Sequence, residues 1–157
     1  MSFDEFKNKF RMDINRSLLA IAFTLFGLMV SLKPAILSNI PLIAIQLTIA
    51  VPLLLSSTFG RSRLHTAKNK RIWEEYCFVT FLLGYSLLIN VLGILLTLVI
   101  GLQFGILFFA VNILVSIIYS SVEIFEDRSR LLQRTLKDLS FFFLILIGGI
   151  LPSMGIY

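Results

Sequence analysis

Four polar side chains lie near the middle of the long apolar runs of this sequence. They are Thr24, Thr48, Asn90 and Asn112. An asparagine in hydrocarbon is costly unless its amide finds a hydrogen-bond partner, so these side chains should face other helices or a hydrated cavity. In one interpretation they join helices, with each bond contributing about 0.6 to 2 kcal/mol. In the other they line a narrow path for water, an ion or a small solute.

Further residues fit either interpretation. Gln46 extends the polar set toward one end of its apolar run. Glycines allow helix backbones to approach closely, and three of them begin similar segments, Gly27-Leu28-Met29-Val30-Ser31-Leu32, Gly93-Ile94-Leu95-Leu96-Thr97-Leu98 and Gly149-Ile150-Leu151-Pro152-Ser153-Met154. We therefore expect Gly27, Gly93 and Gly149 to be helix-packing positions.

The sequence offers no constellation of side chains for catalysis. Intramembrane hydrolysis, proton pumping or phosphoryl transfer would need titratable or metal-binding groups in the apolar runs, and we expect none there. His65 stands alone in a basic segment, and Cys77 has no second cysteine with which to form a disulfide or a metal site. We predict a protein that is not an enzyme, with no catalytic residues, no metal and no cofactor.

The polar residues lie in three apolar tracts that are almost free of charged residues. Only Lys33 is charged between Ser17 and Gly60, and no charge occurs from Tyr76 to Val122 or from Leu139 to Tyr157. A helix needs about 20 residues to cross a hydrocarbon core of ~30 Å, so the first two tracts are long enough for two crossings each and the last for one. We predict an all-α polytopic membrane bundle with five transmembrane helices at about residues 17–33, 40–60, 77–100, 102–122 and 139–157. The turns between paired helices are expected at Lys33 to Pro41 and at Gly101-Leu102-Gln103.

Charged segments flank these spans. Residues 1–16 have the pattern of an amphipathic helix, which would lie in the membrane interface or pack on cytoplasmic loops. Glu123 to Asp138 is expected to be an exposed helix, with Glu126 and Arg130, and Arg134 and Asp138, paired at a spacing of four.

The positive-inside rule orients the helices. Placing the N-terminus and the two loops Arg61 to Tyr76 and Glu123 to Asp138 on one side puts every Lys and Arg except Lys33 there. This predicts an integral protein of a cell membrane, plasma or inner, with a cytoplasmic N-terminus and an external C-terminus. The net charge of +5 is then explained by topology, and nucleic acid is not expected as a partner.

An internal repeat is suggested by two matching segments. Ser56-Ser57 precedes Arg61-Ser62-Arg63-Leu64, and Ser120-Ser121 precedes Arg128-Ser129-Arg130-Leu131. We interpret this match as a parallel duplication of a two-helix unit, followed by a fifth helix. The alternative is that apolar sequences resemble one another because they use few residue types.

These observations favour a homo-oligomeric channel or pore for ions or small solutes, formed around the four mid-span polar residues. One alternative is a non-catalytic assembly or accessory subunit of a larger complex, with another membrane protein as partner. A small-solute carrier is the third. Beyond contact with the lipid bilayer, self-association is expected, because so small a bundle has few internal surfaces on which to bury two asparagines.

Overall fold

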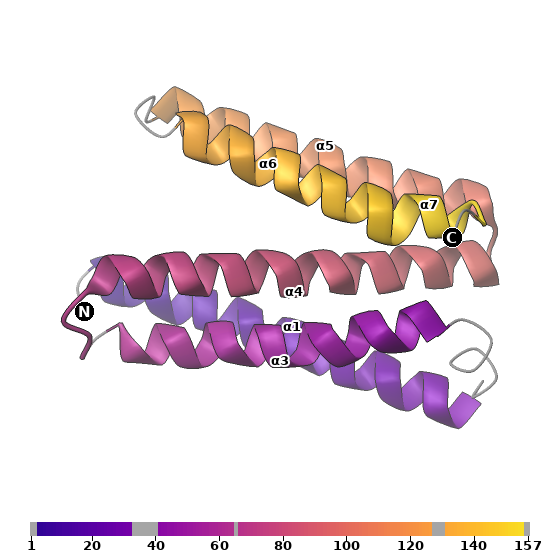
Figure 1. Cartoon of the computed structure of the whole chain (residues 1–157), viewed down its shortest axis with the longest axis horizontal. Helices are drawn as coiled ribbons and strands as arrows, with labels where there is room; N and C mark the ends of the chain where they lie inside the picture. Colours follow the sequence, from indigo (N-terminus) through magenta and orange to yellow (C-terminus); the bar gives the residue numbers. More distant parts are fainter. Residues whose placement is uncertain (1–2, 33–40, 65, 127–130, 156–157) are drawn as a thin grey trace. The chain divides into compact units, whose positions relative to one another are not determined.

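The computed structural model describes residues 3–32, 41–64, 66–126 and 131–155. All the secondary structure in these ranges is helical (Figure 1), which confirms the predicted all-α class. Five of the described helices are long and apolar enough to cross a membrane, over Lys9–Ser31, Pro41–Arg63, Lys70–Val99, Leu102–Val122 and Arg134–Ser153. The predicted number of spans is therefore confirmed.

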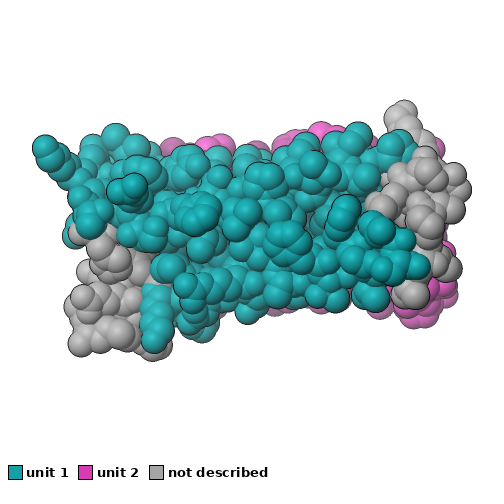
Figure 2. All heavy atoms as spheres, turned by 90° about the horizontal axis from the view of Figure 1, so that it is seen from below, with its two compact units in different colours: residues 1–88 teal, residues 89–157 magenta. Residues whose placement is uncertain are grey.

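The chain divides into two compact units, residues 1–88 and residues 89–157, which Figure 2 distinguishes by colour. The boundary falls inside one continuous helix, α4 (Lys70–Val99). The first part of α4 packs in unit 1 and its last turns pack in unit 2. Each unit has its own buried helix contacts.

Unit 1 contains α1 (Phe3–Leu32), α3 (Pro41–Arg63) and the start of α4. Helix α1 continues without a break past residue 16, where the sequence suggested that a surface helix would give way to the first span. No proline or glycine interrupts this stretch, so nothing ends the helix there. The expected turn at Lys33 to Pro41 lies outside the described residues, except that Pro41 begins α3, a position where a missing N–H is harmless.

Small and branched side chains form the core of unit 1. Helices α1 and α3 lie side by side (Figure 1), with Ala22, Ile43 and Leu54 fully buried. Gly84 allows α4 to pack closely against α3. A Cβ atom at Gly84 would lie only 3.2 Å from the carbonyl oxygen of Ala50. The contact requires a residue without a side chain.

Unit 2 contains the last turns of α4, followed by α5 (Leu102–Glu126) and α6 (Leu131–Ile145). The turn between α4 and α5 is at the predicted place, and Gly101 there has a φ of 133°. Only glycine adopts such a backbone conformation readily. The chain therefore reverses within two residues, so α5 can return beside the last turns of α4.

Helix α6 differs from expectation at both ends. The sequence suggested a separate exposed helix from Glu123 to Asp138, but α5 extends to Glu126 and α6 runs from Leu131 through Asp138 into the last span. No proline or glycine occurs from Leu131 to Ile147, so the polar and apolar segments form one helix. Asp138 is consequently carried into the contact with α5.

The last span contains a π-helical turn, η2 (Leu146–Ile150), which continues into the short α7 (Leu151–Ser153). The N–H of Leu151 donates to the carbonyl of Leu146, five residues earlier. Pro152 follows directly and has no N–H to donate, which favours a local change of hydrogen-bond register.

Candidate functional site at the helix junctions

Asn90 forms a junction between α4 and α6 inside unit 2. Its side chain is fully buried, and its Nδ2 donates a hydrogen bond of 3.1 Å to the carbonyl of Leu144. Leu144 lies in the last turn of α6, immediately before the π-helical turn, where backbone carbonyls change their helical partners. The amide of Asn90 thus supports the backbone at the point where the helix is least regular.

Two of the predicted packing glycines lie around this amide. A Cβ atom at Gly149 would lie 2.6 Å from Oδ1 of Asn90 and 2.6 Å from Cε1 of Phe109. The ring of Phe109, fully buried, also lies directly against Gly93. Gly93 and Gly149 therefore leave the space that the Phe109 ring fills, and the surroundings of Asn90 are apolar and closely packed.

The other predicted polar residues have different surroundings. Asn112, also in unit 2, donates from Nδ2 to the carbonyl of Phe108 in its own helix, at 2.8 Å. Thr24 and Thr48 belong to unit 1 and are exposed, whereas Gln46 of the same unit is buried.

Gly27 differs from the other two predicted packing glycines. It is exposed, and a Cβ atom added to it would meet no atom within 4 Å. No described part of unit 1 packs against it. The prediction of helix packing at Gly27 therefore has no contact within the chain to explain it.

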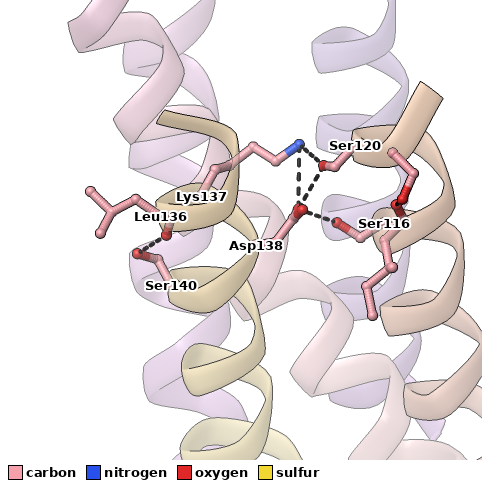
Figure 3. Close-up of polar contacts among 8 residues, drawn as sticks. Ser116, Ser120, Leu136, Lys137, Asp138 and Ser140 are labelled. Atoms are coloured by element: carbon pink, nitrogen blue, oxygen red, sulfur yellow. Dashed lines mark hydrogen bonds and ion pairs between the residues drawn. The ribbon is translucent and has the colours of Figure 1, made fainter. Parts of the chain in front are cut away.

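A second junction, not anticipated from the sequence, joins α5 and α6 through Asp138 (Figure 3). Oδ1 of Asp138 accepts hydrogen bonds from the hydroxyl groups of Ser116, at 3.1 Å, and Ser120, at 2.8 Å. The ammonium of Lys137 donates to Oγ of Ser120 at 2.9 Å and lies 3.5 Å from Oδ1 of Asp138. It also lies 5.4 Å from the centre of the Tyr119 ring. A charged pair and two serines thereby tie the helices together.

An apolar hollow of about 220 Å³ adjoins the Asp138 junction. Ser116 and Asp138 lie at its edge, and most of its wall consists of aliphatic and aromatic side chains, including Ile113, Ile117, Leu139 and Phe142. The surface of the hollow is therefore almost entirely apolar, and the polar atoms of Ser116 and Asp138 are engaged with each other.

A third junction joins the three helices of unit 1. Nδ2 of Asn15 on α1 donates to Oγ of Ser57 on α3 at 3.1 Å, and this hydroxyl donates to the carbonyl of Cys77 on α4 at 2.9 Å. All three residues are almost fully buried. Asn15 was not recognised from the sequence because it lies among the charged residues that suggested a surface helix.

Ser57 and Ser120 have comparable roles. Each donates to a group on the next helix, 20 and 18 residues later in the chain, but Ser57 is the second serine of its pair and Ser120 the first, so they are not equivalent positions of the suggested repeat. Part of the second Arg-Ser-Arg-Leu segment, residues 128–130, lies outside the described residues. The duplication itself stays a prediction.

The chemistry available at the three junctions is hydrogen bonding and ion pairing. Within the described ranges, no group of three His, Cys, Asp or Glu side chains is placed to hold a metal ion. The serine hydroxyls at the junctions are each engaged as donors.

Comparison with known proteins identified no relative: no family model, curated protein or solved structure matches the chain. The assignment consequently comes from the helices themselves. By the length and composition of its five apolar helices, the chain fits an integral membrane protein.

Proposed function

We propose that this chain is a non-catalytic membrane subunit that associates with other membrane helices, and that its buried polar residues hold its own helices together. The observation that carries the proposal is the state of Asn90. Its side chain is fully buried, its Nδ2 donates to the backbone carbonyl of Leu144, and its Oδ1, which accepts no described hydrogen bond, lies against Gly149. A side chain that lines a conducting path must contact water or solute, whereas this one contacts protein.

The outward face of α1 supplies a surface for association. Ser17, Ala20, Thr24, Gly27 and Ser31 are all small and all exposed. At about 100° per residue they fall within roughly 80° of the helix circumference. Stripes of small residues allow two membrane helices to approach closely, and their hydroxyl groups can bond across the contact.

The opposite face of α1 is already used within the subunit. Asn15, Leu19, Ala22 and Met29 are buried there. The small-residue stripe thus lies on the side that the rest of unit 1 leaves uncovered. We propose a second copy of the chain as its partner, because a stripe of this kind is complementary to itself.

The test measures association and conductance together. The full chain is purified in mild detergent for native mass spectrometry and reconstituted in liposomes for ion flux. We expect oligomers of the wild type, a smaller oligomer fraction for Gly27→Leu, and no change for Ile21→Leu, an exposed control outside the stripe. Liposomes should show no flux above the protein-free background. Monomers alone, or flux that Asn90→Leu alters while assembly persists, would contradict the proposal.

An oligomeric pore is the second candidate, and the exposure of Thr24 and Thr48 favours it. If copies associate through α1, the hydroxyl groups of Ser17, Thr24 and Ser31 lie between subunits and could line a path there. Thr24→Val would then change flux while leaving the oligomer intact. Absence of flux in the wild type eliminates this candidate.

A further inference from the structure

Arg61 is a buried cation in unit 1, near the end of α3. It is the first charged residue after the apolar stretch from Pro41 to Gly60, and only 7% of its surface is exposed. Its Nε is fully buried and has no hydrogen-bond partner among the described residues. A buried guanidinium is destabilising unless an anion and hydrogen-bond acceptors compensate it. Arg61 therefore offers a positive charge and a free donor to an anionic ligand.

A second guanidinium lies near Arg61. Asn15 of α1 donates to Ser57 of α3, and these two helices run in opposite directions (Figure 1). Arg11 lies one turn before Asn15. Arg61 lies one turn after Ser57, so antiparallel packing brings the two arginines to the same level. Their like charges repel each other, and Arg11 is exposed. The two arginines therefore extend positive charge from the helix junction to the surface.

The charge balance around the two arginines favours an anion. Glu74 of α4 attracts Arg61, but it is exposed, and no ion pair joins the two in the described part of the chain. Glu75, the next acid along α4, is paired with Arg71. Two cations thus share the attraction of one exposed carboxylate. This surplus of positive charge favours an anionic ligand over a zwitterionic one.

Aromatic residues place Arg61 at the level of lipid headgroups. Ser57 donates to the carbonyl of Cys77 on α4, and α3 and α4 run in opposite directions (Figure 1). One turn further along α3, Arg61 is therefore level with Trp73, which lies one turn before Cys77. The rings of Trp73 and Tyr76 meet edge to face, with their centres 5.8 Å apart. Because Trp and Tyr concentrate at membrane–water interfaces, Arg61 lies where lipid phosphates are found.

We propose that Arg61 and Arg11 bind the phosphate of an anionic phospholipid, such as phosphatidylglycerol, where α1 and α3 meet at this end of unit 1. The planar fork of an arginine donates parallel charge-assisted hydrogen bonds to phosphate oxygens. The phosphate accepts from Arg61 and screens its repulsion by Arg11. A lipid holds its phosphate at this level of the membrane, which favours it over a phosphate ion from solution.

The experiment uses the purified full chain in mild detergent, with phosphatidylglycerol and phosphatidylcholine of identical acyl chains. Native mass spectrometry measures the dissociation constant of each lipid. We expect the wild type to bind phosphatidylglycerol about tenfold more tightly, because the surplus positive charge repels the choline cation. Inorganic phosphate at the same concentration should leave this binding unchanged. Equal binding of the two lipids would overturn the proposal, and so would displacement of phosphatidylglycerol by inorganic phosphate.

Matched variants separate a site at Arg61 from general attraction between a basic surface and an anionic lipid. Arg61→Gln should reduce the preference for phosphatidylglycerol to less than about twofold. Arg63→Gln removes the same charge from an exposed position two residues later and should leave the preference intact. Arg61→Lys keeps the charge but lacks the planar fork, so it should lose most of the preference. Equal losses in Arg61→Gln and Arg63→Gln would overturn the proposal.

A variant at the exposed arginine tests the site even if Arg61→Gln fails to fold. Arg11→Gln leaves the buried helix contacts of unit 1 in place, because Arg11 is exposed. It should weaken the binding of phosphatidylglycerol severalfold and leave that of phosphatidylcholine nearly unchanged. An unchanged preference in Arg11→Gln would contradict a phosphate held by both arginines.

Discussion

The side-chain amide of Asn90 donates a hydrogen bond of 3.1 Å to the backbone carbonyl of Leu144, 54 residues later in the chain. This bond joins the final turns of α4 to the end of α6, beside the π-helical turn and the glycine that admits Phe109. Because the amide is fully buried, its removal should affect the folded state more than the loss of a solvated hydrogen bond would.

Asn90→Ala should therefore lower the free energy of unfolding by about 1 to 2 kcal/mol, since it removes a buried interhelical bond. Asn112→Ala is the matched control, because Asn112 bonds within its own helix and is only partly buried; it should lower this free energy by less than about 0.5 kcal/mol. Unfolding in mixed detergent and SDS micelles, followed by circular dichroism, measures both. Equal losses of unfolding free energy in the two variants would show that the hydrogen bond to Leu144 adds no stability beyond that of a bond within one helix.

Replacing glycine by alanine should change stability in opposite directions at the buried and the exposed glycines. Gly149→Ala and Gly93→Ala insert a methyl group against Asn90 and Phe109, and such overpacking should destabilise the chain by about 1 to 3 kcal/mol. Gly27→Ala meets no atom within 4 Å and should stabilise α1 by up to about 1 kcal/mol through helix propensity. The same SDS titration compares the three variants. Destabilisation of the monomer by Gly27→Ala would place that glycine in a tight contact within the chain, whereas an effect confined to the oligomer would place it in the proposed contact between copies.

Ser57 connects the three helices of unit 1, so Ser57→Ala breaks its bonds to Asn15 and to the carbonyl of Cys77. We expect a loss of about 1 to 2 kcal/mol. Ser62→Ala, in the same helix, removes an exposed bond to the carbonyl of Phe59 and should change stability by less than about 0.5 kcal/mol. Thermal unfolding in detergent compares the stability of the two variants. A larger loss for Ser62→Ala than for Ser57→Ala would contradict the junction.

Ser120 and Ser121 are adjacent but differ in partner. Ser120→Ala removes the hydroxyl that bonds Asp138 and accepts from Lys137, and it should lower the free energy of unfolding by about 1 to 2 kcal/mol. Ser121 bonds only the carbonyl of Ile117 in its own helix among the described contacts, so Ser121→Ala should have little effect. Unfolding in mixed detergent and SDS micelles measures both variants, and equal losses would contradict the junction.

The spans were predictable from sequence because lipid imposes a length and an apolar composition on every crossing helix. The turn at Gly101 was predictable for a local reason as well, since its backbone conformation requires glycine. Local composition therefore determined the number of helices and this turn. It did not determine which face of each helix meets a neighbour.

Two residues of the junctions show what could not be predicted from local composition. Asp138 was assigned to an exposed ion pair because Arg134 lies four residues before it, yet it accepts bonds from Ser116 and Ser120 on another helix. The two serines, spaced by four in an apolar run, were the only signal for a polar contact there. Asn15 was likewise hidden among charged neighbours. Which polar side chain finds a partner depends on tertiary packing, which the periodicity of one helix does not contain.

Cysteine labelling on intact cells tests the five-span account most directly. Single cysteines are introduced at Lys9, Lys68, Gln103 and Met154, all exposed, in a Cys77→Ser background, and treated with a membrane-impermeant maleimide. With a cytoplasmic N-terminus and five crossings, the cysteines at Gln103 and Met154 should react on intact cells, and those at Lys9 and Lys68 only after permeabilisation. Labelling of Lys68→Cys from outside, or protection of Gln103→Cys, would contradict the predicted threading of the five spans.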